Sequence, residues 1–205
     1  MNILAIGSHP DDIEFGCGGS LLKYSRNGHS VFLLILTDGS FGGNPKIRIK
    51  EQEAAAKFIK TKNIFWGGFK DTELVGSREL ILKIERVVQR VSPDIVFLNY
   101  WDDVHQDHRA AASAGVSATR YIKEVLFYEV PTTQNFTADI FVDITSVLKS
   151  KLKLLSIHRS QVSKTGVEKL SILESAISCA NYRGFQARVK YAEGFKASRF
   201  LMDIA

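Results

Sequence analysis

The chain has 205 residues, of which 45% are hydrophobic and 24% are charged, and this composition is typical of a globular protein. It excludes a disordered chain, a collagen-like repeat and a coiled coil, and its longest apolar segments, such as Val31–Leu36, are too short to span a membrane. The net charge of +5 is a mild basic bias, which a solvated basic surface explains more simply than a nucleic-acid partner does.

Buried strands and amphipathic helices alternate along the sequence. In chain order we predict a strand at Asn2–Gly7, a helix at Gly16–Gly28, a strand at Val31–Leu36, a helix at Arg48–Lys60, a strand at Asn63–Trp66, a helix at Arg78–Val91, a strand at Asp94–Leu98, a helix at His108–Thr119, strands at Glu124–Tyr128 and Ile140–Asp143, and helices at Ser146–Ser156 and Val167–Asn181. The last segment, Tyr191–Leu201, fits either a helix or an edge strand.

This alternation indicates right-handed crossover connections between parallel strands. We therefore expect an α/β fold: a three-layer, Rossmann-like, mostly parallel sheet with helices on both faces. The length predicts a single domain over residues 1–205.

Three polar loops follow the first, second and fourth predicted strands. They are His9–Asp12, Thr37–Ser40 and Asp102–His108. Ligands of such sheets bind beyond the carboxyl ends of the strands, so these loops should meet at one rim and form an active site there.

Two of these loops combine histidines with carboxylates. The histidines are His9, His105 and His108, and the carboxylates are Asp11, Asp12, Asp103 and Asp107. Two imidazoles and one carboxylate, with open positions for water and substrate, are typical of catalytic zinc or another divalent metal.

Neighbouring residues of the same type suggest a division of roles. Of Asp11 and Asp12, one could bind the metal while the other accepts a proton from water. Of His105 and His108, one could bind the metal while the other faces the substrate as an imidazolium, with Asp103 or Asp107 orienting the ring and favouring its charged form.

The segment Ser8–Gly19, SHPDDIEFGCGG, resembles the HPDD opening of the LmbE-like, PIG-L-type de-N-acetylases, and His105–His108 resembles their HxDH motif. Weaker similarities to family motifs occur at Arg48–Glu51, Gly68–Asp71, Ser156–Gln161 and Tyr191–Phe195. This family includes enzymes that deacetylate N-acetylglucosaminyl-phosphatidylinositol and the glucosaminyl precursors of small thiols.

The resemblance implies one divalent metal ion, zinc or ferrous iron, bound by His9, Asp12 and His108. It implies that Asp11 is the general base and that His105 stabilises the oxyanion and protonates the leaving amine. The remaining residues that it implicates are Asp107, which would orient His105, and Arg48 and Asp71, which would contact sugar hydroxyls.

The implied function is hydrolysis of the N-acetyl group of a GlcNAc-type glycoconjugate or nucleotide sugar, with release of acetate. Two alternatives stay open: a metal-dependent phosphoesterase, and a sugar- or nucleotide-binding module with a decayed centre. A phosphoesterase would commonly need ligands for a second ion. One departure from the family concerns the loop after the second strand, where Ser40 replaces the glutamate of many members.

The expected partner is a small N-acetylated sugar, without nucleic acid and without a membrane span. The N-terminus does not have the pattern of a signal peptide, and two distant cysteines, Cys17 and Cys179, favour reduced thiols and a cytoplasmic location. Members of the family often form trimers or hexamers, which makes a homo-oligomer an expectation here.

Overall fold

The computed structural model describes residues 1–202 of the chain. Its strands are β1 (Asn2–Gly7), β2 (Ser30–Thr37), β3 (Asn63–Phe69), β4 (Ile95–Asn99), β5 (Glu124–Tyr128), β6 (Ile140–Asp143) and β7 (Ala192–Arg199). Its helices are α1 (Asp12–Arg26), α2 (Pro45–Ile59), α3 (Arg78–Val91), α4 (Gln106–Ala118), α5 (Leu148–Leu155) and α6 (Ile172–Ala187), with a short 3₁₀ helix, η1, at Ser40–Gly42.

Within these described residues the strands form one seven-stranded sheet in the order β3-β2-β1-β4-β5-β7-β6. Strands β1 to β5 are parallel, whereas β7 pairs antiparallel with both β5 and β6. The prediction of a mostly parallel α/β sheet is confirmed. The segment that sequence could not assign is strand β7, and it lies inside the sheet because β6 forms the edge beyond it.

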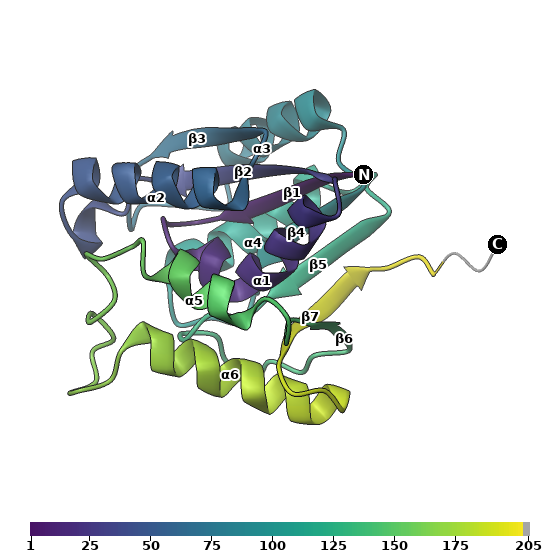
Figure 1. Ribbon diagram of the computed structural model, residues 1–205. Coiled ribbons are helices and arrows are strands. Elements are labelled where there is room, and N and C mark those ends of the chain that lie inside the picture. The colour runs from purple at the N-terminus through teal and green to yellow at the C-terminus, as the bar shows by residue number, and fades with distance from the viewer. Residues whose placement is uncertain (203–205) are drawn as a thin grey trace.

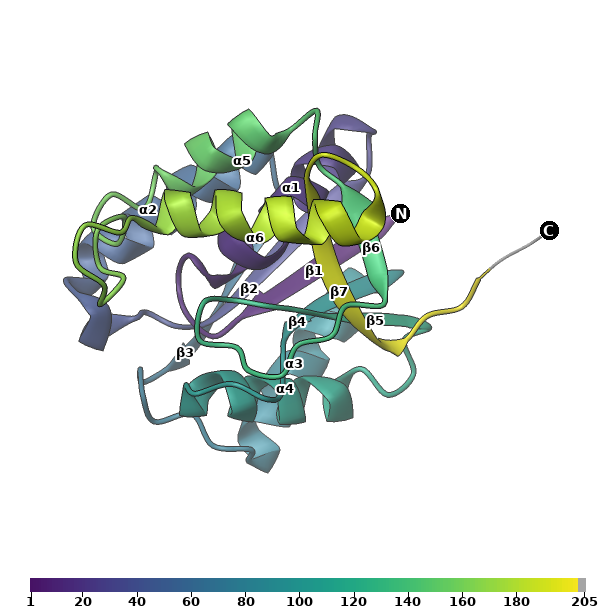
Figure 2. The same cartoon turned by 90° about the horizontal axis from the view of Figure 1, so that it is seen from below.

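Helices cover both faces of this sheet. Figures 1 and 2 show α1, α2, α5 and α6 on one side and the pair α3 and α4 on the other. The apolar run of β1 accounts for this arrangement, because Ile3 and Ala5 pack into the first core while Leu4 and Ile6 pack into the second. Strands that are buried on both faces need continuous apolar sequence, and this explains why β1 lacks polar alternation.

Helix α1 packs unusually close to the sheet, and this fixes the loop that precedes it. A methyl group on Gly16 would lie 2.1 Å from the ring of Tyr128 in β5, so only glycine allows this approach. The hydroxyl of Tyr128 in turn donates to the carbonyl of Ile6 at the end of β1 (2.9 Å). The loop between β1 and α1 is therefore held firmly against the carboxyl end of the sheet.

The main differences from the predicted elements are the two ends of α6, which begins five residues after the predicted Val167 and ends six residues after the predicted Asn181. The helix was expected from Val167, but it begins at Ile172 because Ser171 and Glu174 form a reciprocal capping box there. Residues 167–171 belong instead to a loop beside the site described below. Among the described residues, none of the helices has the length and apolar character that crossing a membrane requires.

Candidate active site

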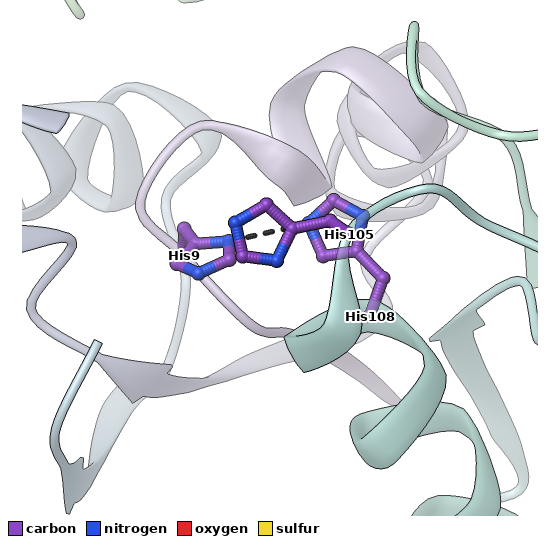
Figure 3. Close-up of side chains that lie close together, drawn as sticks. All are labelled: His9, His105 and His108. Atoms are coloured by element: carbon purple, nitrogen blue, oxygen red, sulfur yellow. Dashed lines mark hydrogen bonds between the residues drawn. The ribbon is translucent and has the colours of Figure 1, made fainter. Parts of the chain in front are cut away.

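The polar loops meet at the topological switch point of the sheet, between β1 and β4. Strands β1 and β4 are neighbours, but from β1 the chain proceeds to β2 and from β4 to β5, on opposite sides. Such a switch point leaves a crevice at the carboxyl ends of the two strands. Figure 3 shows that His9, His105 and His108 gather there, His9 from the loop after β1 and the other two from the start of α4.

Three donor atoms from His9, Asp12 and His108 form a small triangle. His9 Nδ1 lies 3.2 Å from His108 Nε2, and Asp12 Oδ2 lies 3.3 Å from His108 Nε2 and 3.5 Å from His9 Nδ1. All three side chains are buried. The sequence motifs single out these three residues, and the fold places their ligating atoms close together.

The charges of this triangle support one another. Although burial alone would raise the pKa of Asp12, the neighbouring His108 and His9 hold it well below its usual range. Burial would lower the pKa of His108, but Asp12 and Asp103 outweigh it and raise this pKa to about 9. These shifts indicate that the carboxylates around the triangle favour positive charge at this point, whether a protonated ring or a bound cation carries it.

The other ring nitrogen of each histidine faces carboxylates. His9 Nε2 lies 3.0 Å from Asp71 Oδ1 and 3.1 Å from Asp107 Oδ2, while His108 Nδ1 lies 3.2 Å from Asp103 Oδ2. A carboxylate behind an imidazole fixes the ring orientation and its tautomer, and it leaves the opposite nitrogen free to bind a metal. The contacts therefore direct His9 Nδ1 and His108 Nε2 into the triangle.

Two other sets of ligand atoms are close enough together to hold an ion: those of His9, His105 and His108, and those of His9, Asp71 and Asp107. The second of these sets contains two carboxylates, which already accept backbone hydrogen bonds. The N–H of Phe41 donates to Asp71 Oδ2 (2.7 Å), and the N–H of Thr72 donates to Asp107 Oδ2 (2.8 Å). Asp12 Oδ2 also accepts a backbone hydrogen bond, from the N–H of His9 (2.9 Å), so these bonds alone do not separate this set from the triangle. The triangle is favoured because it combines two imidazole nitrogens with one carboxylate, the donor set typical of catalytic zinc.

Asp11 stands next to the triangle in a strained backbone conformation. Its φ of 92° lies in the left-handed region, and the side-chain oxygen of Gln52 holds it there by accepting the Asp11 N–H (3.2 Å). The carboxylate of Asp11 is more exposed than that of Asp12, with Arg48 Nη2 at 3.4 Å from its Oδ1. Burial raises the pKa of Asp11 to about 6, although Arg48 and His158 act against this shift.

His105 caps the N-terminus of α4. Its Nδ1 accepts the backbone N–H of Asp107 (3.2 Å), and its ring stacks on that of His108 with centroids 4.8 Å apart. Burial and the charges of His9 and His108 lower the pKa of His105, while Asp107 opposes this. We expected the carboxylate of Asp107 to orient His105, but this carboxylate contacts His9 instead. The charged state that we expect for His105 during the reaction stays a prediction.

Arg48 and Asp71 lie in the site, but mainly as structural contacts. Arg48 is buried and donates to the carbonyls of Gly39 (2.7 Å) and Pro10 (2.7 Å), which joins the loops after β2 and β1. Asp71 is buried against His9. Both residues still line the cavity, so the contact with sugar hydroxyls that we expected from them stays a prediction.

A cavity of about 840 Å³ extends from the donor triangle. The triangle, Asp11 and His105 line it together with the loop 130–133, the loop 161–170 and the start of α6, and Thr132 lies beside His108, with its hydroxyl oxygen 3.5 Å from His108 Nδ1. Pockets for small molecules commonly have several hundred Å³, and this one is large enough for a disaccharide. Ser40 does not line it but faces a neighbouring depression with Phe41 and Asp71.

Sequence reasoning missed the role of Gln52 entirely. Gln52 is fully buried and connects Asp11 to Glu14, because its Nε2 donates to Glu14 Oε1 (2.7 Å). Glu14 Oε2 lies 3.5 Å from His158 Nε2, so His158, which belongs to the weakly similar segment Ser156–Gln161, is buried next to this group. One signal was available: Gln52 follows Arg48 by four residues and shares its helix face.

Comparisons with known proteins cover most of the chain. The family model described as PIG-L: GlcNAc-PI de-N-acetylase matches residues 4–119, a span that contains the whole donor triangle. The diacetylchitobiose deacetylase of Thermococcus kodakarensis is 30% identical, over 95% of this chain and 82% of its own. The uncharacterized deacetylase YaiS of Escherichia coli is 32% identical, over 77% of this chain and 90% of its own.

The fold has a close counterpart among solved structures. The N,N'-diacetylchitobiose deacetylase of Pyrococcus horikoshii, determined with an inhibitor, superimposes with a TM-score of 0.83 and 26% sequence identity. The superposition covers 96% of this chain and 83% of the other one. The similarity therefore includes the C-terminal part, which lies outside the segment matched by the family model.

Proposed function

The chain belongs to the PIG-L family, and from this premise we propose that it is a divalent-metal-dependent hydrolase that removes the acetyl group from an N-acetylated amino sugar of the GlcNAc type. The observation that carries the proposal is the donor triangle of His9, Asp12 and His108 with the carboxylate of Asp11 beside it in a sugar-sized cavity. The relatives compared above are named deacetylases, which supports the same reaction.

The geometry of the triangle fits a zinc-type ion. Zinc bonds to nitrogen and oxygen of about 2.0–2.1 Å place tetrahedral ligand atoms about 3.3 Å apart, and the three distances here are 3.2, 3.3 and 3.5 Å. His9, Asp12 and His108 would hold the ion, and ferrous iron suits the same donors. When bound, such an ion supplies Lewis acidity, which polarises an amide carbonyl and acidifies water.

Asp11 is the residue that moves the proton. One oxygen of its carboxylate takes the proton from the attacking water as the water oxygen bonds to the acetamide carbon. A pKa of about 6 suits this task, because the group is ionised at neutral pH and still basic enough to accept. The same carboxyl then returns the proton to the amine nitrogen as the C–N bond breaks, and the second proton of the water, left on the acid product, passes to the amine, which gives acetate and an ammonium group.

His105 stabilises the developing charge on the acetamide oxygen. Because its Nδ1 accepts the N–H of Asp107, the neutral ring carries its proton on Nε2. That N–H is available to the oxyanion, and the lowered pKa of His105 favours this neutral donor over an imidazolium acid. The proposal thus differs from the expectation that His105 protonates the leaving amine.

Acetate release decides the proposal. Zinc-loaded protein is incubated with N,N'-diacetylchitobiose, N-acetylglucosaminyl malate and a nucleotide sugar, alongside a panel of phosphate esters, and Asp11→Asn serves as the matched control. We expect acetate from at least one sugar, no phosphate, and acetate release from the control that is slower by about 10²–10⁴-fold. Phosphate release, or acetate release that Asp11→Asn leaves intact, would refute the assignment.

The proposed location is the cytoplasm. Cys17 is buried and Cys179 is partly buried, and neither takes part in a disulfide within residues 1–202. Unpaired thiols in this state fit a reducing compartment.

A further inference from the structure

A second, smaller cavity opens beside Asp11 and Asp12. Its volume is about 80 Å³, against about 840 Å³ for the main cavity. Seven of its nine lining residues also line the main cavity, and only Leu155 and His158 belong to it alone. It is therefore a side chamber that leads inward from the position of the base; we call it the side chamber below.

The size of the side chamber restricts what it can hold. A protein cavity of about 150 Å³ accommodates benzene, which has six non-hydrogen atoms. By the same proportion, about 80 Å³ accommodates about three non-hydrogen atoms. An acetyl group has three, two carbons and one oxygen, whereas a sugar ring has many more and requires the main cavity.

The walls of the side chamber are mainly apolar. Phe15, Val130, Leu155 and Ile172 line it, and the first three of these are buried. Such walls suit a methyl group, while a hydroxylated sugar would lose its hydrogen bonds there. The chemistry of the chamber thus agrees with its size.

We propose that the side chamber holds the acyl group of the substrate and restricts it to acetyl. This inference rests on the proposed function, because the scissile carbonyl must lie beside Asp11, and both cavities reach Asp11 and Asp12. The whole acetyl group then lies in the side chamber, with its carbonyl toward Asp11 and Asp12 and its methyl between the apolar walls, while the amide nitrogen lies at the junction and the sugar in the main cavity.

A buried polar ring adds to the limit on chain length. His158 is only 2% exposed, it lines the side chamber but not the main cavity, and neither of its ring nitrogens has a hydrogen-bond partner within residues 1–202. Glu14 Oε2 lies 3.5 Å from its Nε2. An alkyl chain longer than acetyl would fill the space beside this ring with carbon, so that no water could hydrogen-bond to its unpartnered nitrogens.

Substrates that differ only in acyl length test the proposal. The kcat/KM of zinc-loaded protein is measured for the N-acetyl, N-propionyl and N-butyryl forms of one amino sugar. One methylene in a fitted pocket changes kcat/KM by roughly 10- to 200-fold, so we expect propionyl to fall at least tenfold below acetyl and butyryl further. Equal values for acetyl and butyryl would overturn the proposal.

Widening the side chamber should relax this selectivity. Ile172→Ala removes three carbons from a wall at the first turn of α6, and it should raise the butyryl-to-acetyl ratio of kcat/KM about tenfold or more. Ile177→Ala is the matched control, because Ile177 lies on the same helix, is 36% exposed and lines neither cavity. If Ile172→Ala folds poorly, Val130→Ala shortens another wall and should act in the same direction.

A binding measurement separates this proposal from the proposed function. Calorimetric titration of the zinc-loaded protein with acetate and with butyrate requires no turnover. We expect acetate to bind at least tenfold more tightly, and Ile172→Ala to narrow the difference. If no N-acyl sugar is hydrolysed, the proposed function fails, and the acetate preference alone decides whether the chamber selects acetyl; equal binding of the two ions would refute it.

Discussion

Replacing Asp71 by Asn distinguishes an orienting role from a substrate contact. Asp71 accepts two hydrogen bonds in the structure, from His9 Nε2 (3.0 Å) and from the N–H of Phe41 (2.7 Å), with one oxygen for each. An asparagine has only one acceptor oxygen, so one of these donors loses its partner. It also removes the negative charge that supports His9 as a ligand.

We expect Asp71→Asn to lower zinc affinity about tenfold, which corresponds to about 1.4 kcal/mol. This is the lower end of the roughly 10- to 100-fold loss that follows when a residue that orients a metal ligand is removed. The lower end applies because Asp107 Oδ2 also contacts His9 Nε2, at 3.1 Å, and continues to orient the ring. Zinc affinity is measured by competition with a chelator of known affinity, and KM is measured at saturating zinc.

Asp38→Asn is the matched control, since Asp38 follows β2 at the same rim and lines the depression beside Asp71 but not the main cavity. We expect it to leave zinc affinity unchanged. Unchanged zinc affinity in Asp71→Asn, together with a raised KM, would refute the orienting role and restore the sugar contact that the sequence predicts.

Four further substitutions, at three residues, test the proposed catalytic and metal-binding roles. Asp11→Asn should retain one zinc per chain but lower kcat by about 10²–10⁴, whereas Asp12→Asn should lower zinc affinity; the reverse pattern would exchange their roles. His105→Ala should lower kcat by about 10²–10³ with little change in KM, because the hydrogen bond forms mainly in the transition state. His105→Gln, which retains an N–H donor, should recover part of that loss, and an equal loss in both variants would contradict the role of His105 as a neutral donor.

The fold was predictable where local signals agree with packing. The helix Arg78–Val91 has its predicted ends because Ser77 accepts the N–H of Leu80 at its start and Ser92-Pro93 follows it. Strand β7 could not be assigned, because its position between β5 and β6 depends on residues about 50 to 70 positions away in the chain. Local sequence carries no information about such partners.

The candidate site was predictable as a location and less so in its contacts. Strand ends at a common rim were enough to place His9, Asp12 and His108 near one another. The partner of Asp107 could not be predicted in this way. Its carboxylate could face His9 or His105, and the choice depends on the hydrogen bond that the backbone N–H of Thr72 donates to it. Orienting residues of this kind are set by three-dimensional packing and not by motif spacing.

The most direct test of the account is a crystal structure of the zinc-loaded protein with anomalous scattering measured at the zinc absorption edge. We predict one ion bound by His9 Nδ1, Asp12 and His108 Nε2, at about 2.0–2.2 Å from each atom. An ion on the other side of His9, bound at Nε2 with Asp71 and Asp107, would contradict the ligand assignment and the catalytic roles derived from it.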